Sequence, residues 1–213
     1  MSDDTLREEL DGLLARDKTA HVERLALAAA IVSEALRARG LEATLVGGGA
    51  IEFYAPGAYA TSDIDLVVER ARPLDDLERA LAESFESLGF SRAGRHWRRA
   101  DLFVEVPSTH VTDPTESFAI GPYRLRVLRK EILLGERIVG FKHWRYTGYG
   151  AQALDLMAAF GGDLDEAVLR TYLHREGAED AFDRLRALAA SGRPITDELL
   201  RQTMDTLRGG KPG

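Results

Sequence analysis

Two aspartates, Asp63 and Asp65, stand one residue apart in the run DIDLVV, which alternates polar and apolar side chains. Successive side chains of an extended strand point to opposite faces, so both carboxylates project from the same face. Carboxylates this close repel each other unless a cation lies between them. Mg²⁺ binds one or two carboxylates together with phosphate oxygens and water, so the pair predicts a magnesium site that receives phosphates.

A glycine triplet, Gly47, Gly48 and Gly49, follows the apolar run 43–46 and precedes residues 50–54, which can begin a helix. Glycine lets a ligand approach the backbone, and N–H groups near a helix start can bind phosphates. Taken alone, a glycine triplet is more often a plain turn, and an Asp-x-Asp pair is common on solvated strand edges. In this order and spacing the two features predict one nucleotide site.

The run resembles the signature of the DNA polymerase β-like nucleotidyltransferase superfamily: an apolar strand ending in Gly47-Gly48, a short helix, and then Asp63-Ile64-Asp65. Thr61-Ser62, just before the first aspartate, is most similar to small prokaryotic members, including the AbiEii-like toxins. The resemblance implies an α/β (α+β) fold with a short mixed sheet, flanking helices and a helical C-terminal region. It also implies Ser62 beside the nucleotide and two Mg²⁺ ions, or Mn²⁺, on the two aspartates.

The activity implied by the resemblance is transfer of a nucleoside monophosphate from an NTP to an acceptor hydroxyl, with release of pyrophosphate. The acceptor could be tRNA or another RNA, a protein or a small molecule. The toxin of a toxin–antitoxin pair, with an antitoxin as partner protein, is one form of this activity. The alternatives are a noncatalytic nucleotide- or partner-binding module of the same fold, and an aminoglycoside-type nucleotidyltransferase.

A third carboxylate is expected from the run DLFVEV at 101–106, where alternation puts Asp101, Phe103 and Glu105 on one face. The superfamily takes its third acid from a later strand in an apolar-acid-apolar setting, which Val104-Glu105-Val106 resembles, although aspartate is commoner there. Glu105 would then be the third metal ligand. Asp101 is the rival candidate, and a solvent-facing Glu105 is the alternative.

Lys142 and Asp155 resemble the lysine and aspartate that follow the sheet in AbiEii-like nucleotidyltransferases, which implies that both lie at the nucleotide. An ammonium there would offset the charge that builds on the leaving pyrophosphate. Lys142 could instead be a solvated helix residue. Asp155, between Leu154 and Leu156, is expected to be half-buried, and it could pair with Arg145 or Lys142.

Basic residues crowd the segment 90–99 around Trp97. They could clamp an RNA or an acceptor phosphate, with Trp97 as a stacking surface. The alternative is the solvated face of a hairpin.

The chain has 213 residues, 45% of them hydrophobic, no cysteine and a net charge of −7. This length suits one catalytic domain, expected at 1–147, and a helical region, expected at 148–213 and packed on it. The start has no signal-peptide pattern and no apolar run is long enough to span a membrane, so we expect a cytoplasmic protein. The charge argues against nonspecific coating of nucleic acid.

Further elements follow from periodicity and capping residues. We expect a helix from Pro73 to Leu88, strands at 90–99, 101–106 and 123–128, a loop at 108–122, and a helix from Lys130 to Trp144. Asp163 with Glu166, and Thr196, are expected to cap later helices.

Overall fold

The computed structural model describes residues 2–15, 21–59, 61, 63–71 and 76–207, and the chain divides into two compact units, Met1–Arg129 and Lys130–Gly213. The first unit contains a mixed sheet with helices and the second is helical, which confirms the α/β class with a helical C-terminal region. The predicted boundary at 147/148 is too late, because the helix that begins at Lys130 belongs to the second unit. That the two regions pack together stays a prediction.

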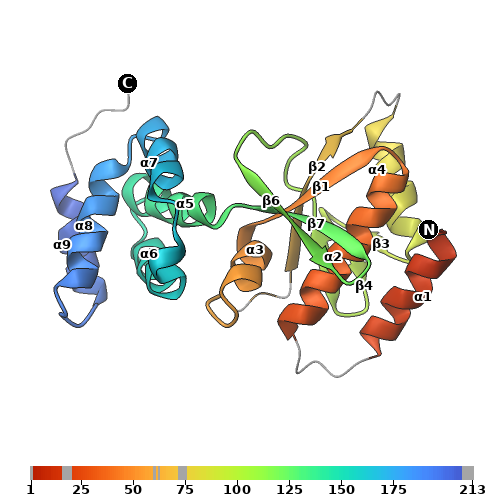
Figure 1. Cartoon of the computed structure of the whole chain (residues 1–213), viewed down its shortest axis with the longest axis horizontal. Helices are drawn as coiled ribbons and strands as arrows, with labels where there is room; N and C mark the ends of the chain where they lie inside the picture. Colours follow the sequence, from red (N-terminus) through yellow and green to blue (C-terminus); the bar gives the residue numbers. More distant parts are fainter. Residues whose placement is uncertain (1, 16–20, 60, 62, 72–75, 208–213) are drawn as a thin grey trace. The chain divides into compact units, whose positions relative to one another are not determined.

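Seven strands of the described residues form one sheet, in the order β3-β4-β5-β2-β1-β7-β6 (Figure 1). They are β1 (Leu41–Val46), β2 (Asp63–Arg70), β3 (Ser91–Ala93), β4 (His96–Arg99), β5 (Leu102–Glu105), β6 (Thr115–Ile120) and β7 (Tyr123–Leu128). β2 lies between β1, to which it is antiparallel, and β5, to which it is parallel. The sheet is thus mixed as expected, but wider than the short sheet that the sequence predicted.

One face of this sheet is apolar and carries the helices α1 (Asp3–Leu14), α2 (His21–Ala38) and α4 (Leu77–Ser87). α2 packs on β1 and β7 (Figure 1), and Phe85 of α4 stacks on Trp97 of β4 with 4.8 Å between the ring centroids. Leu45 of β1 and Leu66 of β2 are fully buried on this side. Because side chains alternate along a strand, the intervening polar residues of β2 and β5 point to the opposite face.

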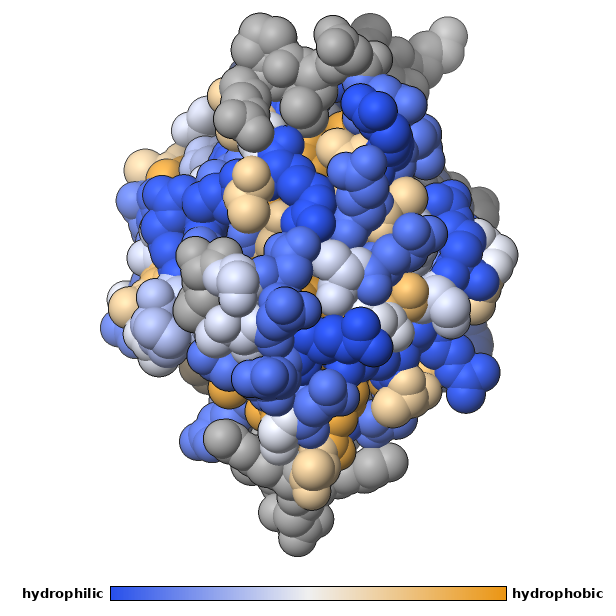
Figure 2. All heavy atoms as spheres, turned by 90° about the vertical axis from the view of Figure 1, so that its right-hand side faces the viewer, coloured by the Kyte–Doolittle hydropathy of each residue, from blue (hydrophilic) through white to orange (hydrophobic). Residues whose placement is uncertain are grey.

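Helix α1 presents a strongly polar surface on the outside of the first unit. Leu6, Leu10 and Leu13 of α1 are buried, while most of its charged residues are exposed. The side of the molecule that carries α1 is mostly hydrophilic, with apolar side chains in small separate areas (Figure 2).

Three predictions of local structure in the first unit were wrong. The expected single strand at 90–99 is a hairpin of β3 and β4, because Gly94 adopts a left-handed turn conformation with φ 64°. The expected loop at 108–122 contains β6. None of its side chains is buried, so the strand lacks the regular alternation of apolar and polar residues by which the other strands were predicted. The helix expected to begin at Pro73 is α4, which begins at Leu77. Asp76 is its N-cap and accepts from Arg79 N. Pro73 lies outside the described residues.

The second unit consists of helices joined by short connections: α5 (Lys130–His143), α6 (Thr147–Phe160), a short 3-10 turn (Gly161–Asp163), α7 (Glu166–Arg175), α8 (Glu179–Ala190) and α9 (Asp197–Thr206). Thr196 caps α9 as predicted, accepting from Leu199 N. Asp165, rather than the predicted Asp163, caps α7. No helix within the described ranges is both long and apolar enough to cross a membrane.

Candidate functional site

The predicted acids come together on the sheet face that the apolar helices do not cover. Asp65 of β2 is directly opposite Glu105 of the parallel strand β5, and Asp63 is opposite Phe103. Side chains in register on neighbouring strands share a face. Three carboxylates from two strands are therefore neighbours, as the alternation in the sequence predicted for Asp63 and Asp65.

Asp65 has the most perturbed electrostatics of the three. Burial, then the charges of Glu105 and Asp63, raise the pKa of Asp65, and the N–H of Gly48 and the nearby His96 oppose this rise. Asp65 forms no ion pair with any lysine or arginine of the described residues. A half-buried carboxylate beside two other acids would be stabilised by an added cation.

The glycine triplet lies directly beside the Asp65 carboxylate. Helix α3 (Gly47–Tyr54) begins inside the triplet, and the backbone N–H of Gly48 lies near the Asp65 carboxylate, whose pKa it lowers. That the glycines bind a nucleotide phosphate stays a prediction. Gly47 has a φ of 61°, and a Cβ there would overlap the Asp65 carboxylate. A Cβ on Gly49 would lie 3.2 Å from the carbonyl oxygen of Asp63. The triplet allows β2 to approach closely, and the start of α3 faces an acid, as its dipole favours.

Glu52 orders the loop between α3 and β2, and it was not among the predicted site residues. The residue is 3% exposed, and its carboxylate accepts from the backbone N–H groups of Gly57, at 3.0 Å, and Tyr59. The Tyr59 ring consequently lies where a side chain on Gly48 would be, since a Cβ at Gly48 would be 2.5 Å from Tyr59 Cε1. A lone acid between the apolar Ile51 and Phe53 was the signal that could have identified Glu52.

The end of the same loop leads directly into the acids. Thr61 Oγ1 accepts a hydrogen bond from Asp63 N at 3.1 Å. Ser62, predicted at the nucleotide, lies outside the described residues.

The two candidates for the third acid have different partners. Asp101 forms a two-bond ion pair with the buried Arg24, at 3.0 and 2.6 Å. Glu105 lies opposite Asp65 but also contacts Arg95 Nε at 3.2 Å and His96 Nε2 at 3.3 Å. Position on the sheet thus favours Glu105, while its contacts tie its carboxylate to the β3–β4 hairpin.

A divalent cation needs several oxygen ligands that reach one point. Among the described residues, no three His, Asp or Glu side chains are grouped closely enough to hold a metal ion as they stand. Asp63 and Asp65 fit Mg²⁺ in donor type, and the like charges that raise the pKa of Asp65 favour an added cation beside it. Glu105 fits only once its contacts with Arg95 and His96 are released.

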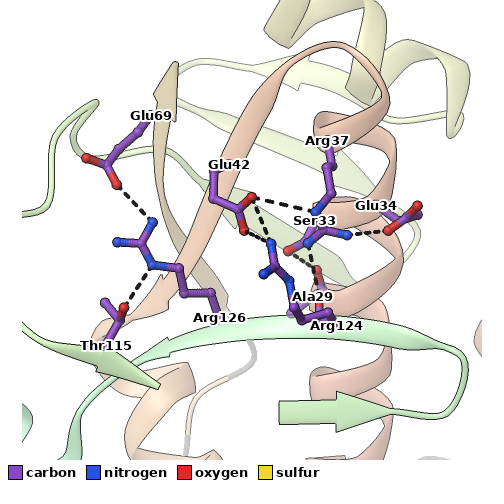
Figure 3. A network of polar contacts seen from close by, with 9 residues as sticks. All are labelled: Ala29, Ser33, Glu34, Arg37, Glu42, Glu69, Thr115, Arg124 and Arg126. Carbon is purple, nitrogen blue, oxygen red and sulfur yellow. Dashed lines mark hydrogen bonds and ion pairs between the residues drawn. The ribbon is translucent and has the colours of Figure 1, made fainter. Parts of the chain in front are cut away.

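Acids at the other end of this sheet face are neutralised within the chain (Figure 3). Glu42 and Glu69 are directly opposite on β1 and β2, where like charges would repel. Arg124 binds Glu42 and Arg126 binds Glu69, each at 3.1 Å. Asp65 differs from both, because no arginine of the described ranges pairs with it.

The basic residues of 90–99 divide between the two faces of the sheet. Trp97 is 4% exposed and stacks on Phe85, so the prediction of Trp97 as a stacking surface was wrong. Arg92 covers Trp97 at 5.1 Å from its ring, and Arg99 pairs with Asp11. His96 and Arg98 are in register with Glu105 and Phe103 and share their face.

Lys142 and Asp155 lie in the second unit. Lys142 Nζ donates to the carbonyl oxygen of Gly177 at 2.7 Å and to Asp180 Oδ1 at 2.6 Å, and its side chain is 10% exposed. It is therefore not a solvated helix residue.

Asp155 is exposed, so the expectation of a half-buried acid was wrong. Its predicted partners are engaged elsewhere, because Arg145 pairs with Asp205 and Lys142 with Asp180. Leu154 and Leu156 are buried, yet neighbours in a helix point in different directions, so buried neighbours do not bury the residue between them.

A cavity of about 450 Å³ lies apart from the acids. Its lining is mainly apolar and includes Leu13, Leu27, Phe53 and Ile120, from α1, α2, α3 and β6. It contains none of the predicted site residues.

Comparisons with models of known families, with curated proteins and with solved structures found no match for this chain.

Proposed function

We propose that the protein is a Mg²⁺-dependent nucleotidyltransferase whose active site is the acid cluster on the sheet face opposite α2 and α4. The observation that carries this proposal is Asp65: a half-buried carboxylate with a raised pKa, beside two further acids and without a lysine or arginine partner in the described chain. The glycine start of α3 and the order strand, helix, acid pair agree with the resemblance seen in the sequence.

Each residue has a defined role in this proposal. Asp63 and Asp65 would hold Mg²⁺, which would supply a positive charge for the NTP phosphates and for the attacking hydroxyl. The acceptor oxygen forms a bond to the α-phosphorus, the bond from that phosphorus to the bridging oxygen breaks, and pyrophosphate leaves. Glu105, once released by Arg95 and His96, would accept the hydroxyl proton.

The test is pyrophosphate release from each of the four NTPs, with Mg²⁺ and with total cellular RNA or protein as acceptor. We expect turnover by the wild type and its loss in Asp63→Asn and Asp65→Asn. Asp4→Asn removes an exposed acid of α1 and should retain full turnover. Turnover that persists in both site variants would refute the assignment. α-Labelled NTPs in the same mixture identify which fraction accepts the nucleotide.

A noncatalytic nucleotide-binding module is the second candidate. The contacts of Glu105 with Arg95 and His96 favour it, because they keep the third acid from joining the pair. Calorimetry with ATP, CTP, GTP and UTP, with and without Mg²⁺, separates the two candidates. Affinity without pyrophosphate release supports the module.

A further inference from the structure

The face beside the acids combines exposed positive charge with an aromatic ring. On β5, Phe103 is in register with Asp63 of β2 and with Arg98 of β4. Arg98 lies over the Phe103 ring, with its guanidinium carbon 5.4 Å from the ring centroid. The stacked pair is thus one strand away from the aspartates and on the same face.

Arg95 adds a second cation at the edge of this surface. It occupies the turn between β3 and β4, its side chain is 77% exposed, and its Nε is 3.2 Å from Glu105. Arg95 and Arg98 therefore flank the acid cluster on its β4 side, although the whole chain carries a net charge of −7. A local concentration of arginine in an acidic protein favours an anionic ligand at this place.

From this arrangement we infer that the acceptor is a single-stranded nucleic acid, held through its phosphates by Arg95 and Arg98 and through one base by the Arg98–Phe103 stack. Arginine and an aromatic ring together match a chain in which phosphates alternate with flat bases. A cationic aminosugar would be repelled by the two guanidinium groups. That this ligand is the acceptor rests on the proposed function. The binding surface itself does not depend on catalysis.

A bound nucleic acid would also change the contact between Arg95 and Glu105. A phosphate that draws the Arg95 guanidinium toward itself removes one of the two partners of Glu105 and leaves His96 as the other. With the acceptor bound, Glu105 keeps only its contact with His96 and is held less firmly by the β3–β4 hairpin. This accounts for a third acid that is correctly placed on the sheet and nevertheless engaged in the free protein.

The experiment measures binding of a short fluorescein-labelled single-stranded RNA of mixed sequence by anisotropy, without NTP or Mg²⁺, over a range of salt concentrations. A parallel arm uses DNA of the same sequence, and a third arm uses a fluorescent aminoglycoside. For the wild type we expect binding of a nucleic acid that weakens steeply with salt. Each arginine removed, in Arg95→Ala and Arg98→Ala, should make the negative slope of log affinity against log salt less steep by about 0.7.

Phe103→Leu should weaken binding by roughly 5- to 150-fold with an unchanged salt slope, because it removes stacking and no charge. The control is the pair Arg7→Ala and Arg79→Ala, which removes two exposed cations from α1 and α4. It should leave affinity and slope unchanged. Thermal melts of every variant verify folding.

Affinity for RNA, DNA or both supports the surface and identifies the strand type. No affinity at low salt, equal weakening by the control pair, or tighter binding of the aminoglycoside would overturn it. The binding assay contains no nucleotide and is therefore independent of the turnover assay. Nucleic acid binding in the first, with no pyrophosphate release in the second, would refute the proposed function alone. Pyrophosphate release without nucleic acid binding would refute this inference alone.

Discussion

The Asp65 carboxylate combines two tasks with opposite effects on the stability of the fold. The backbone N–H of Gly48 at the start of α3 lowers its pKa, and Asp65 shares a sheet face with Asp63 of the same strand and Glu105 of β5. The first task stabilises the fold, since an acid at a helix start interacts favourably with the dipole. The second destabilises the fold until a cation arrives. A substitution at Asp63 leaves Gly48 beside Asp65. It therefore measures the repulsion among the three carboxylates more directly than a substitution at Asp65 would.

We expect Asp63→Asn to leave the melting temperature of the metal-free protein unchanged or raised, while activity with Mg²⁺ is lost. The reason is that the substitution removes one of three neighbouring negative charges and keeps the shape of the side chain. Calorimetric melting without metal and with Mg²⁺ provides the measurement. A large drop in melting temperature would identify Asp63 as a structural partner instead.

The raised pKa of Asp65 predicts the sign of a pH effect. An acid whose pKa is higher in the folded state than in the unfolded state binds its proton more tightly when folded, so protonation stabilises the fold. The free energy of unfolding of the wild type, relative to Asp65→Asn, should therefore rise as pH falls from neutral toward the ordinary aspartate value of 3.8. Urea unfolding of both proteins across this range measures the difference. A difference that falls on acidification would show that the N–H contact of Gly48 outweighs the repulsion.

At the scale of elements, β1, α3 and β2 form a unit in which small residues set the distances. The alternation in 63–68 and the apolar run before Gly47 were enough to predict both strands and the shared face of the aspartates. The sequence did not reveal that the glycines lie inside α3, because a glycine triplet equally suits a turn. Nor did it predict that Glu52 fixes the loop over Gly48, since that contact joins a helix side chain to the backbone of a following loop.

Gly48→Ala tests the close approach of this loop. A Cβ at Gly48 would lie 2.5 Å from Tyr59 Cε1, so the ring and the loop held by Glu52 must move. We expect a loss of about 1–3 kcal/mol in the free energy of unfolding, the usual cost of overpacking. Gly12→Ala is the matched control, because a Cβ there meets nothing within 4 Å on the exposed side of α1. It should stabilise by about 0.5–1 kcal/mol. Equal stabilities in urea for Gly48→Ala and the wild type would disprove the tight fit.

At the scale of the whole molecule, the division into units follows contacts that a sequence pattern does not contain. The apolar periodicity of 130–144 predicted a helix correctly, but the same periodicity is compatible with either unit as its packing partner. α5 belongs with α6, α7 and α8, and buried Glu131 of α5 accepts from Asp165 N at the start of α7. Lys142 near the end of α5 likewise contacts the α7–α8 connection, which the resemblance to nucleotidyltransferases did not anticipate.

Lys142→Ala and Asp180→Ala together show whether the Lys142 ammonium stabilises the second unit or binds the NTP phosphates. Its contacts with Gly177 O and Asp180 predict that both substitutions destabilise the second unit to a similar extent. The loss should be about 1.5–3 kcal/mol for hydrogen bonds to a charged group, near the lower end because Asp180 is 52% exposed. The same variants are titrated with NTP and Mg²⁺. We expect equal NTP affinities in the two, as for a lysine that supports the helical unit. A 10- to 100-fold weakening, roughly that of a lost charge-assisted contact, in Lys142→Ala alone would assign the ammonium to the phosphates.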